Sequence, residues 1–338
     1  MFPKRKIGKT SLETTILGFG AAPLGNLYRP VENNLAKETL EAAIGAGIGY
    51  FDTAPYYGFG LSERRIGDVL RNLQENEYVL SSKVGRLLTP IRGYSGVKGR
   101  HGYCSPMPFE PVYDYSYDAI MRSYEDSLQR LGLAKIDILL VHDIGTMTHG
   151  EENDLHFKTF IESGYKALDE LRSSGEIAAI GLGVNEAEIC EQAMEHGSFD
   201  CFLLAGRYSL LEQDAMNSML PKCEKHGASI IMGGIYNSGI LATGTKTKKP
   251  SYNYKRAPGV VIKKVRKIEE VCKAHNVPLP AAALQFPLAH KLTCCVIPGI
   301  SSPKRVKQSI DLYKHEIPTD FWKELKEKKL LREDAPTP

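Results

Sequence analysis

Eight short apolar runs, each followed by a helix-like segment, constrain the fold of this chain more than any other feature. The runs expected to form strands cover residues 16–20, 48–52, 78–83, 136–141, 177–183, 201–205, 229–232 and 293–297. The amphipathic segments between them predict helices over residues 35–47, 62–72, 117–131, 157–174, 186–196, 215–226, 260–275 and 303–313. Short apolar strands separated by helices indicate a parallel sheet that is covered on both faces. Eight such units predict an α/β fold, a closed (β/α)8 TIM barrel.

Three segments lie outside this alternation. Residues 4–15 predict an N-terminal β-hairpin, and residues 322–331 predict a charged C-terminal helix. Residues 86–116, after the third strand, are rich in Gly, Pro and Tyr and predict a loop of about thirty residues, a length that is more often functional than accidental. No linker or shift in composition divides the chain, so we expect residues 1–338 to form a single domain.

Composition argues against several classes of function. The net charge of +3 is too small to favour a nucleic acid or a membrane surface as partner. No apolar run approaches the ~20 residues that span a bilayer, and the basic N-terminus lacks the apolar core of a secretory signal. The seven cysteines include no CxxC pair, which predicts free thiols in a reducing cytoplasm and no metal site. We expect a cytoplasmic monomer or weak homo-oligomer that acts on a small molecule.

Four titratable side chains at neighbouring strand ends form the candidate catalytic site. Asp52 ends the second strand, Lys83 the third and His142 the fourth, and Tyr57 lies in the loop after the second. Active sites of such barrels lie at the carboxyl ends of the strands, so all four would face one mouth. An ion pair, a core histidine or a packed tyrosine would explain each residue alone. The expected position of all four residues at one mouth favours a catalytic role over these separate structural explanations.

The expected chemistry is proton transfer coupled to hydride transfer. An unperturbed phenol titrates near ~10, and lowering its pKa by about two units takes only ~3 kcal/mol of interaction with the Lys83 ammonium. Asp52 would keep Lys83 charged, and His142 would orient the substrate oxygen. Without a metal site, the natural coupled step is hydride transfer to a nicotinamide cofactor.

These residues resemble the aldo-keto reductase superfamily over about residues 5–315. The run Asp52-Thr-Ala-x-x-Tyr57-Gly58, the strand-end Lys83, Val141-His142 and the segment Val296-Ile297-Pro298-Gly299 recur in the family's order. The resemblance implies that Tyr57 is the general acid/base, that Lys83 and Asp52 tune it, and that His142 orients the substrate. It also implies NAD or NADP as cofactor, extended across the barrel mouth.

The same resemblance predicts the cofactor-binding residues. They are Gly20, Asn185, Arg207, Ser238, Gly239, Leu241, Gly299, Ser301, Ser302 and Arg305. Asn185 would contact the carboxamide, and the last seven would hold phosphates after the seventh and eighth strands. Gly299-Ile300 replaces the Lys-Ser pair that many NADPH-dependent members use for the 2′-phosphate, which weakens the case for strict NADP, while Arg305 keeps it open. A salt-bridged arginine at the rim would explain Arg207 equally well.

Finer motifs resemble one subgroup, the D-threo-aldose (L-fucose, galactose) 1-dehydrogenases and pyridoxal 4-dehydrogenase. They cover residues 183–186, 205–211 and 233–241. The resemblance implies oxidation of a cyclic hemiacetal, such as L-fucose or D-galactose, to the lactone. Pyridoxal oxidation and NADPH-dependent reduction of an aldehyde or ketone are alternatives. A further alternative, a non-catalytic cofactor-sensing subunit, is disfavoured because all four catalytic positions are present.

Aromatic residues of the long loop are expected to form the substrate wall. They are Tyr94, Tyr103, Phe109, Tyr113 and Tyr115. Such rings could stack on a sugar face or a pyridine ring, or they could only pack the loop onto the barrel. His149 and His156, in the next loop, are expected to be solvated.

Overall fold

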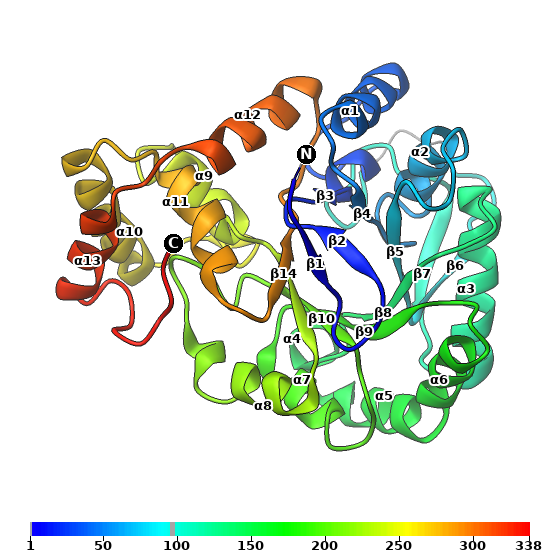
Figure 1. Ribbon diagram of the computed structural model, residues 1–338. Coiled ribbons are helices and arrows are strands. Elements are labelled where there is room, and N and C mark those ends of the chain that lie inside the picture. The colour runs from blue at the N-terminus through cyan, green and yellow to red at the C-terminus, as the bar shows by residue number, and fades with distance from the viewer. Residues whose placement is uncertain (1, 95–98) are drawn as a thin grey trace.

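A closed barrel of eight parallel strands forms the centre of the computed structural model, which describes residues 2–94 and 99–338 (Figure 1). In the order of their pairing, the strands are β3 (Phe19–Gly20), β4 (Tyr50–Asp52), β5 (Val79–Val84), β8 (Ile138–His142), β9 (Ala179–Val184), β10 (Cys201–Ala205), β11 (Ser229–Gly233) and β14 (Thr293–Val296). Parallel bridges pair Leu17 with Val296 and Gly20 with Gly299. These two bridges, called the seam below, join the first strand to the last. The predicted (β/α)8 barrel is therefore confirmed.

Helices surround this barrel (Figure 1). The α-helices are α1 (Asn33–Gly45), α2 (Leu61–Leu70), α3 (Tyr117–Leu131), α4 (Thr146–His149), α5 (Asn153–Thr159), α6 (Tyr165–Ser173), α7 (Ala187–Ala193), α8 (Met219–His226), α9 (Ile240–Thr243), α10 (Gly259–Ala274), α11 (Leu279–Gln285), α12 (Pro303–Lys314) and α13 (Thr319–Glu327). The 3₁₀ turns are η1 (Ala22–Gly25), η2 (Gly150–Glu152), η4 (Asp214–Met216), η5 (Asn237–Gly239) and η6 (Phe286–Ala289), and η3 (Phe160–Gly164) is a π-helical turn between α5 and α6. None of the described helices is long and apolar enough to cross a membrane.

Helix α3 illustrates how the sequence specifies these elements. The Ser116 hydroxyl accepts a hydrogen bond from the backbone N–H of Ala119 at the start, and Gly132 ends the helix with a φ of 62°. Such caps bond backbone groups that have no partner inside the helix. Helix α2 has no such side-chain cap at its start, where Gly60 is the N-cap residue. The Ser62 hydroxyl is buried and donates instead to the carbonyl of Ala21.

Within residues 2–94 and 99–338, three antiparallel strand pairs add to the barrel. The first is the predicted N-terminal pair, β1 (Lys4–Lys6) with β2 (Glu13–Thr15). The second, β6 (Arg86–Pro90) with β7 (Phe109–Tyr113), lies inside the segment predicted as a loop. The third is β12 (Ser251–Tyr252) with β13 (Lys255–Arg256). Its two turn residues, Asn253 and Tyr254, have φ of 48° and 60°, as a tight hairpin turn requires.

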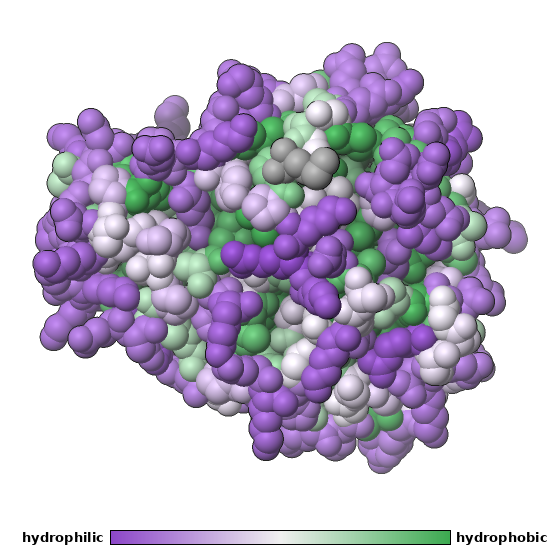
Figure 2. Space-filling model, in the orientation of Figure 1, coloured by the Kyte–Doolittle hydropathy of each residue, from purple (hydrophilic) through white to green (hydrophobic). Residues whose placement is uncertain are grey.

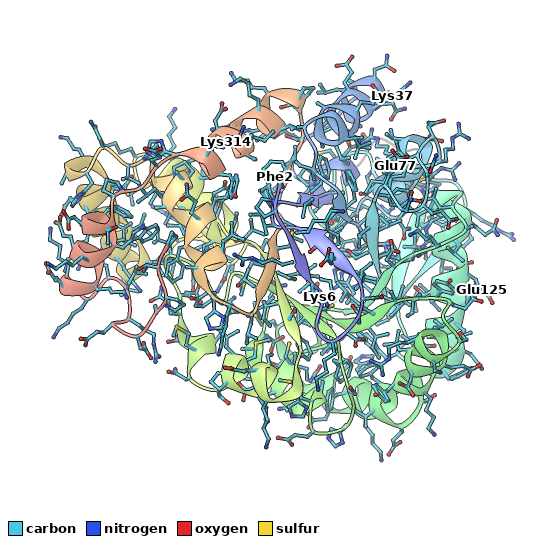
Figure 3. All side chains as sticks on the ribbon, in the orientation of Figure 1. Phe2, Lys6, Lys37, Glu77, Glu125 and Lys314 are labelled. Atoms are coloured by element: carbon cyan, nitrogen blue, oxygen red, sulfur yellow. The ribbon has the colours of Figure 1, made fainter. Side chains whose placement is uncertain are left out.

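The β1–β2 hairpin covers the amino end of the barrel, which faces the viewer in Figure 1. Ile7, in its turn, is fully buried against the first residues of the barrel strands. Arg5 Nη1 donates to the carbonyls of Leu288 and Thr293 at 2.9 and 2.6 Å. Hydrophilic side chains dominate this face in Figure 2, and Lys6, Lys37 and Glu125 are among them in Figure 3. The open end of the barrel is therefore the carboxyl end.

Candidate active site

A cavity of about 470 Å³ opens at the carboxyl end of the barrel. Tyr57, Lys83 and His142 line it, from the β4–α2 loop, β5 and β8. Asp52 lies behind Lys83 at the end of β4. The structure thus brings together all four residues that the sequence predicts as catalytic.

Asp52 and Lys83 form a buried ion pair. Their side chains are each 2% exposed, and Lys83 Nζ donates to both carboxylate oxygens of Asp52 at 2.8 Å. A third hydrogen bond, also 2.8 Å, runs from Nζ to the carbonyl of Thr53. An ammonium group has three N–H donors, so these bonds use all of them. Burial raises the pKa of Asp52, and the Lys83 cation opposes that rise.

The Tyr57 ring lies beside this pair. Lys83 Nζ is 4.7 Å from the ring centroid, and the hydroxyl has no hydrogen-bond partner among the described residues. Contrary to the sequence-based expectation, the pKa of Tyr57 is raised well above its usual value, first by burial and then by the charge of Asp52. Burial is the main reason, and the Asp52 carboxylate beside Lys83 adds to it. The phenol is therefore the resting form at neutral pH.

Two glycines hold the backbone of Tyr57 in place. Gly58 follows it with a φ of 68°, and a Cβ on Gly58 would lie 2.4 Å from the carbonyl oxygen of Gly25. A Cβ on Gly25 would lie 2.4 Å from the carbonyl carbon of Tyr57. Real Cβ contacts are never this short, so only glycine lets η1 pack directly on the loop that carries Tyr57.

His142 faces Tyr57 edge to face, with ring centroids 5.8 Å apart. Burial, then the charges of Arg86 and Lys83, lower its pKa well below the usual value, so the imidazole is neutral. Its Nδ1 is buried and has no hydrogen-bond partner in the described part of the chain. A neutral imidazole can donate or accept a hydrogen bond, so His142 can bind a substrate oxygen.

Two charged residues that sequence reasoning missed flank these groups. Arg86, the first residue of β6, donates from Nη2 to Oδ2 of Asp143 at 2.6 Å. The same oxygen lies 3.5 Å from His142 Nε2, and Oδ1 accepts from Asn185 Nδ2 at 3.1 Å. Their positions in the sequence could have indicated them, since Asp143 adjoins His142 and Arg86 follows Lys83 by three residues.

The long segment after β5 supplies only part of the predicted aromatic wall. Tyr103 and Tyr113 line the cavity, together with Tyr28 and Tyr254, which sequence reasoning missed. Tyr115 is buried, and its hydroxyl donates to the carbonyl of His142. Phe109 packs with Phe59 and Leu88, and Tyr94 contacts Arg100. The cavity is therefore ringed by aromatic residues from four separate segments.

His149 and His156 are not freely solvated, contrary to expectation. Their ring centroids are 4.2 Å apart, and both are partly buried. The Tyr115 hydroxyl lies 2.9 Å from His149 Nε2. Burial, followed by the neighbouring His156, lowers the pKa of His149 to about 4.

The predicted phosphate-binding residues follow β11 and β14, which are neighbours in the barrel. Ser238, Gly239 and Leu241 lie in η5 and α9, and Gly299, Ser301, Ser302 and Arg305 lie between β14 and the first turn of α12. The Ser302 hydroxyl caps α12, and the first turn of this helix contains no acidic residue. A helix start with basic residues fits an anionic group.

The other predicted cofactor residues differ in their contacts. Gly20 lies on the seam, where its N–H donates to Pro298 and its carbonyl accepts from Ile300. Asn185 lines the cavity, and its Oδ1 accepts from the Tyr254 hydroxyl at 3.2 Å.

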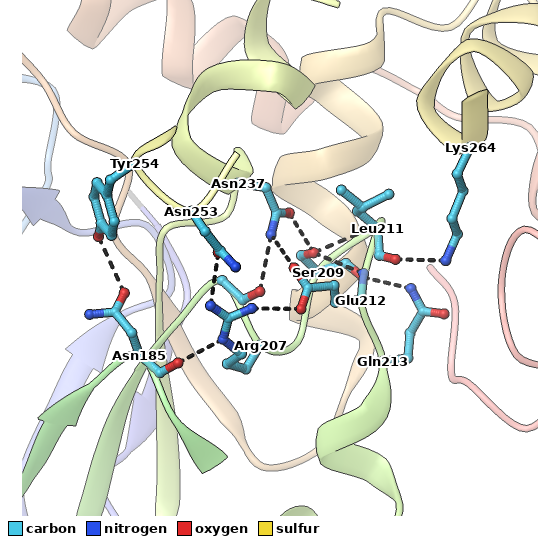
Figure 4. A network of polar contacts seen from close by, with 11 residues as sticks. Asn185, Arg207, Ser209, Leu211, Glu212, Gln213, Asn237, Asn253, Tyr254 and Lys264 are labelled. Atoms are coloured by element: carbon cyan, nitrogen blue, oxygen red, sulfur yellow. Dashed lines mark hydrogen bonds and ion pairs between the residues drawn. The ribbon is translucent and has the colours of Figure 1, made fainter. Parts of the chain in front are cut away.

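Arg207 does not line this cavity, and each of its three guanidinium nitrogens donates to a neighbour (Figure 4). It donates to the carbonyl of Asn185 at 2.6 Å, to Asn253 at 2.8 Å and to Glu212 at 2.7 Å. These contacts match the alternative of a salt-bridged rim arginine. They also position the backbone of Asn185.

Comparisons with known proteins agree with this geometry. A model of the aldo/keto reductase family matches residues 16–329. The chain is 42% identical to pyridoxal 4-dehydrogenase of Microbacterium luteolum, covering 97% of this chain and 98% of that protein. It is 38% identical to D-threo-aldose 1-dehydrogenase of a Pseudomonas species, covering 95% of each.

Solved structures show the same fold. An aldo-keto reductase from Bacillus halodurans superposes with a TM-score of 0.76 at 23% identity, covering 98% of this chain and 97% of the other. A glycerol dehydrogenase from Gluconobacter oxydans gives 0.74 at 20% identity, covering 99% and 97%.

Proposed function

This chain belongs to the aldo/keto reductase family of NAD(P)-dependent oxidoreductases, and we propose that it oxidises the cyclic hemiacetal of an aldose, such as L-fucose or D-galactose, to the lactone. The observation that carries the proposal is the grouping of Tyr57, Lys83 and His142 around one cavity, with Asp52 behind them. Relatives at 42% and 38% identity, both named as dehydrogenases, support the direction of the reaction.

In the proposed reaction the anomeric hydroxyl loses its proton to the phenolate form of Tyr57, which the resting phenol reaches by releasing its own proton to solvent. His142 binds the same oxygen and holds the substrate in the cavity. The Lys83 cation, 4.7 Å from the Tyr57 ring and paired with Asp52, offsets part of the cost that burial and the Asp52 charge place on the phenolate. A nicotinamide cofactor, when bound, would supply the acceptor for the hydride that leaves the anomeric carbon as the carbon–oxygen double bond of the lactone forms.

The residues around the mouth fit such a cofactor. The capped start of α12, with Arg305 in its first turn, suits a phosphate. Small residues, Gly183 and Ala205, line the cavity near Asn185, and a Cβ on Gly183 would lie only 3.1 Å from Lys83 Cε. We propose that Asn185, Ser238, Gly239, Leu241 and the segment 299–305 hold NAD or NADP.

A substrate panel tests this function. Initial rates at 340 nm are measured for L-fucose, D-galactose and pyridoxal with NAD⁺ and with NADP⁺, and for simple aldehydes and ketones with NADPH. We expect turnover of aldoses in the oxidative direction. Turnover in the reductive assays alone would replace this function by that of an aldehyde or ketone reductase.

Tyr57→Phe tests the assigned proton carrier, with Tyr56→Phe as the matched control. Loss of the Tyr57 hydroxyl is expected to lower kcat by about two to four orders of magnitude, the usual contribution of general acid–base catalysis. Dinucleotide binding, measured by quenching of protein fluorescence, should be unchanged. A wild-type kcat in Tyr57→Phe would remove this residue from the mechanism, and a wild-type protein that binds dinucleotide but turns over nothing would favour a cofactor sensor.

Pyridoxal is the second candidate substrate. The aromatic rings of Tyr28, Tyr103, Tyr113 and Tyr254 around the cavity favour a flat heteroaromatic ring, and the relative at 42% identity is named for pyridoxal. The same residues would act on the cyclic hemiacetal form of pyridoxal. A kcat/KM for pyridoxal well above that for every aldose would assign this substrate instead.

A further inference from the structure

The cavity contains a second cation, Arg86, that the proposed chemistry does not use. Arg86 is only 3% exposed, yet it lines the cavity. Lys83 cannot donate to a substrate, because Asp52 and Thr53 accept all three of its N–H groups. A guanidinium has five N–H groups, and Arg86 uses Nη2 to bind Asp143 and has a further hydrogen bond with the Tyr56 hydroxyl, so donors remain. Among the described residues that line the cavity, Arg86 is therefore the cation with N–H groups left for a ligand.

Unused donors in a buried cation need an explanation. Nε of Arg86 is buried and has no hydrogen-bond partner within residues 2–94 and 99–338. An unpaired buried donor loses its hydration without compensation, and such atoms are rare in folded proteins. Because Nε is closed off from the cavity, a ligand oxygen there would bond the remaining N–H groups at the Nη end of the guanidinium.

The guanidinium is held firmly before any ligand arrives. Asp143 accepts from Nη2 at 2.6 Å, and the rings of Tyr56 and Tyr113 lie 4.1 and 5.2 Å from the guanidinium carbon. Asp143 is itself fixed by Asn185 and has a φ of 46°, which few residue types other than Asn, Asp and Gly adopt. A donor fixed in advance binds with less loss of entropy.

Arg86 also lies next to the group that binds the reacting oxygen. One carboxylate oxygen of Asp143 contacts both Arg86 Nη2 and, at 3.5 Å, His142 Nε2. A substrate whose reacting oxygen is bound by His142 and Tyr57 would therefore place its neighbouring substituent near the guanidinium.

We propose that Arg86 is a specificity-determining residue that binds a hydroxyl oxygen on the carbon next to the reacting carbon, and that Asp143 is its positioning residue. The inference rests on the proposed function for the place of the reacting carbon, and it deepens that function. It restricts the substrates to 2-hydroxylated aldoses and 2-hydroxyaldehydes in preference to their deoxy analogues.

The test compares substrates that differ only in this hydroxyl. The pairs are D-galactose with 2-deoxy-D-galactose in oxidation, and lactaldehyde with propanal in reduction. The wild type should prefer the hydroxylated member in kcat/KM by roughly 10- to 100-fold, as expected for a hydrogen bond to a charged group. In Arg86→Met the preference should fall to near one for both pairs, while dinucleotide affinity stays unchanged.

Matched variants separate recognition from loss of charge or structure. Arg64→Met removes an exposed arginine from α2 and should leave the preference at the wild-type value. Asp143→Asn keeps a residue that tolerates the left-handed backbone but removes the carboxylate, so it should lose most of the preference. If Arg86→Met does not fold, Arg86→Lys keeps the charge without the planar fork, and the same fall in preference is expected.

The outcomes distinguish the two proposals. An unchanged preference in Arg86→Met or Arg86→Lys overturns the role of Arg86, whichever sugars are oxidised. If no sugar is oxidised, the proposed function fails, and the lactaldehyde and propanal pair still decides the role of Arg86.

Discussion

Replacing Lys83 with methionine should destabilise the protein in a strongly pH-dependent way. The substitution removes three hydrogen bonds of 2.8 Å and leaves the buried carboxylate of Asp52 with the Ser81 hydroxyl as its remaining partner among the described residues. Breaking a buried ion pair from one side costs about 3–5 kcal/mol, because it leaves an uncompensated charge.

The free energy of protonating Asp52 limits this cost. From an unperturbed pKa of about 3.9, and with 1.36 kcal/mol for each unit, protonation at pH 7 costs about 4 kcal/mol, and at pH 5 about 1.5 kcal/mol. Without Lys83, burial would raise the pKa of Asp52 further than it does in the wild type. A carboxyl whose pKa is higher in the folded state destabilises the fold at pH values above its unfolded pKa, and the penalty shrinks as the pH falls from the folded pKa towards the unfolded one. The loss should therefore shrink by about 2.5 kcal/mol between pH 7 and pH 5.

Urea unfolding at both pH values measures this difference, each variant being compared with the wild type at the same pH. The double variant Asp52→Asn/Lys83→Met is the control, because it carries no charge at either position and its loss of stability should not depend on pH. Equal losses at pH 7 and pH 5 in Lys83→Met would refute the reasoning that the buried Asp52 carboxylate takes up a proton once Lys83 is removed.

Three further outcomes follow from the site and its packing. Because burial and Asp52 raise the pKa of Tyr57, log(kcat/KM) for oxidation should rise with pH into the alkaline range, and a profile that falls between pH 7 and pH 9 would contradict this. The rate of reduction should not fall near pH 6, because the pKa of His142 is already well below 6.5. Gly25→Ala should displace the Tyr57 backbone, lowering kcat at least about tenfold and stability by about 1–3 kcal/mol, as judged by steady-state kinetics and thermal melting. Gly67→Ala is the control, because its Cβ would lie 1.7 Å from the carbonyl oxygen of Leu131, away from the site. This variant should lose a comparable free energy of unfolding while its kcat stays unchanged below the melting transition. A matching fall in its kcat would show that the effect of Gly25→Ala is not local.

The barrel and the grouping of the four candidate catalytic residues could be predicted because both depend on local pattern. Short apolar runs and helical periodicity specify parallel strands, and parallel strands place Asp52, Lys83 and His142 at one mouth whatever the details of packing. The pKa of Tyr57 could not be predicted in the same way. It depends first on how deeply the Tyr57 ring is buried and then on its distance from Asp52, and both are set by tertiary packing.

The cavity residues that the sequence did not predict come mainly from the hairpins. Arg86 begins β6, and a segment rich in Gly, Pro and Tyr gave no clear alternation from which a strand could be predicted. Tyr254 reaches Asn185 across 69 positions of sequence from the β12–β13 turn. Such long-range contacts are set by tertiary packing, which local propensity does not specify.

The seam between β3 and β14 has a consequence for the order in which the molecule is made. All four candidate catalytic residues lie between positions 52 and 142, whereas the seam pairs Gly20 with Gly299. At typical synthesis rates, the roughly 160 residues from His142 to the seam take about 8–30 s to add. During that time β3 and each newest strand present unpaired edges, which are sites for aggregation. The nascent chain therefore carries all four candidate catalytic side chains before the last strand is available to close the barrel.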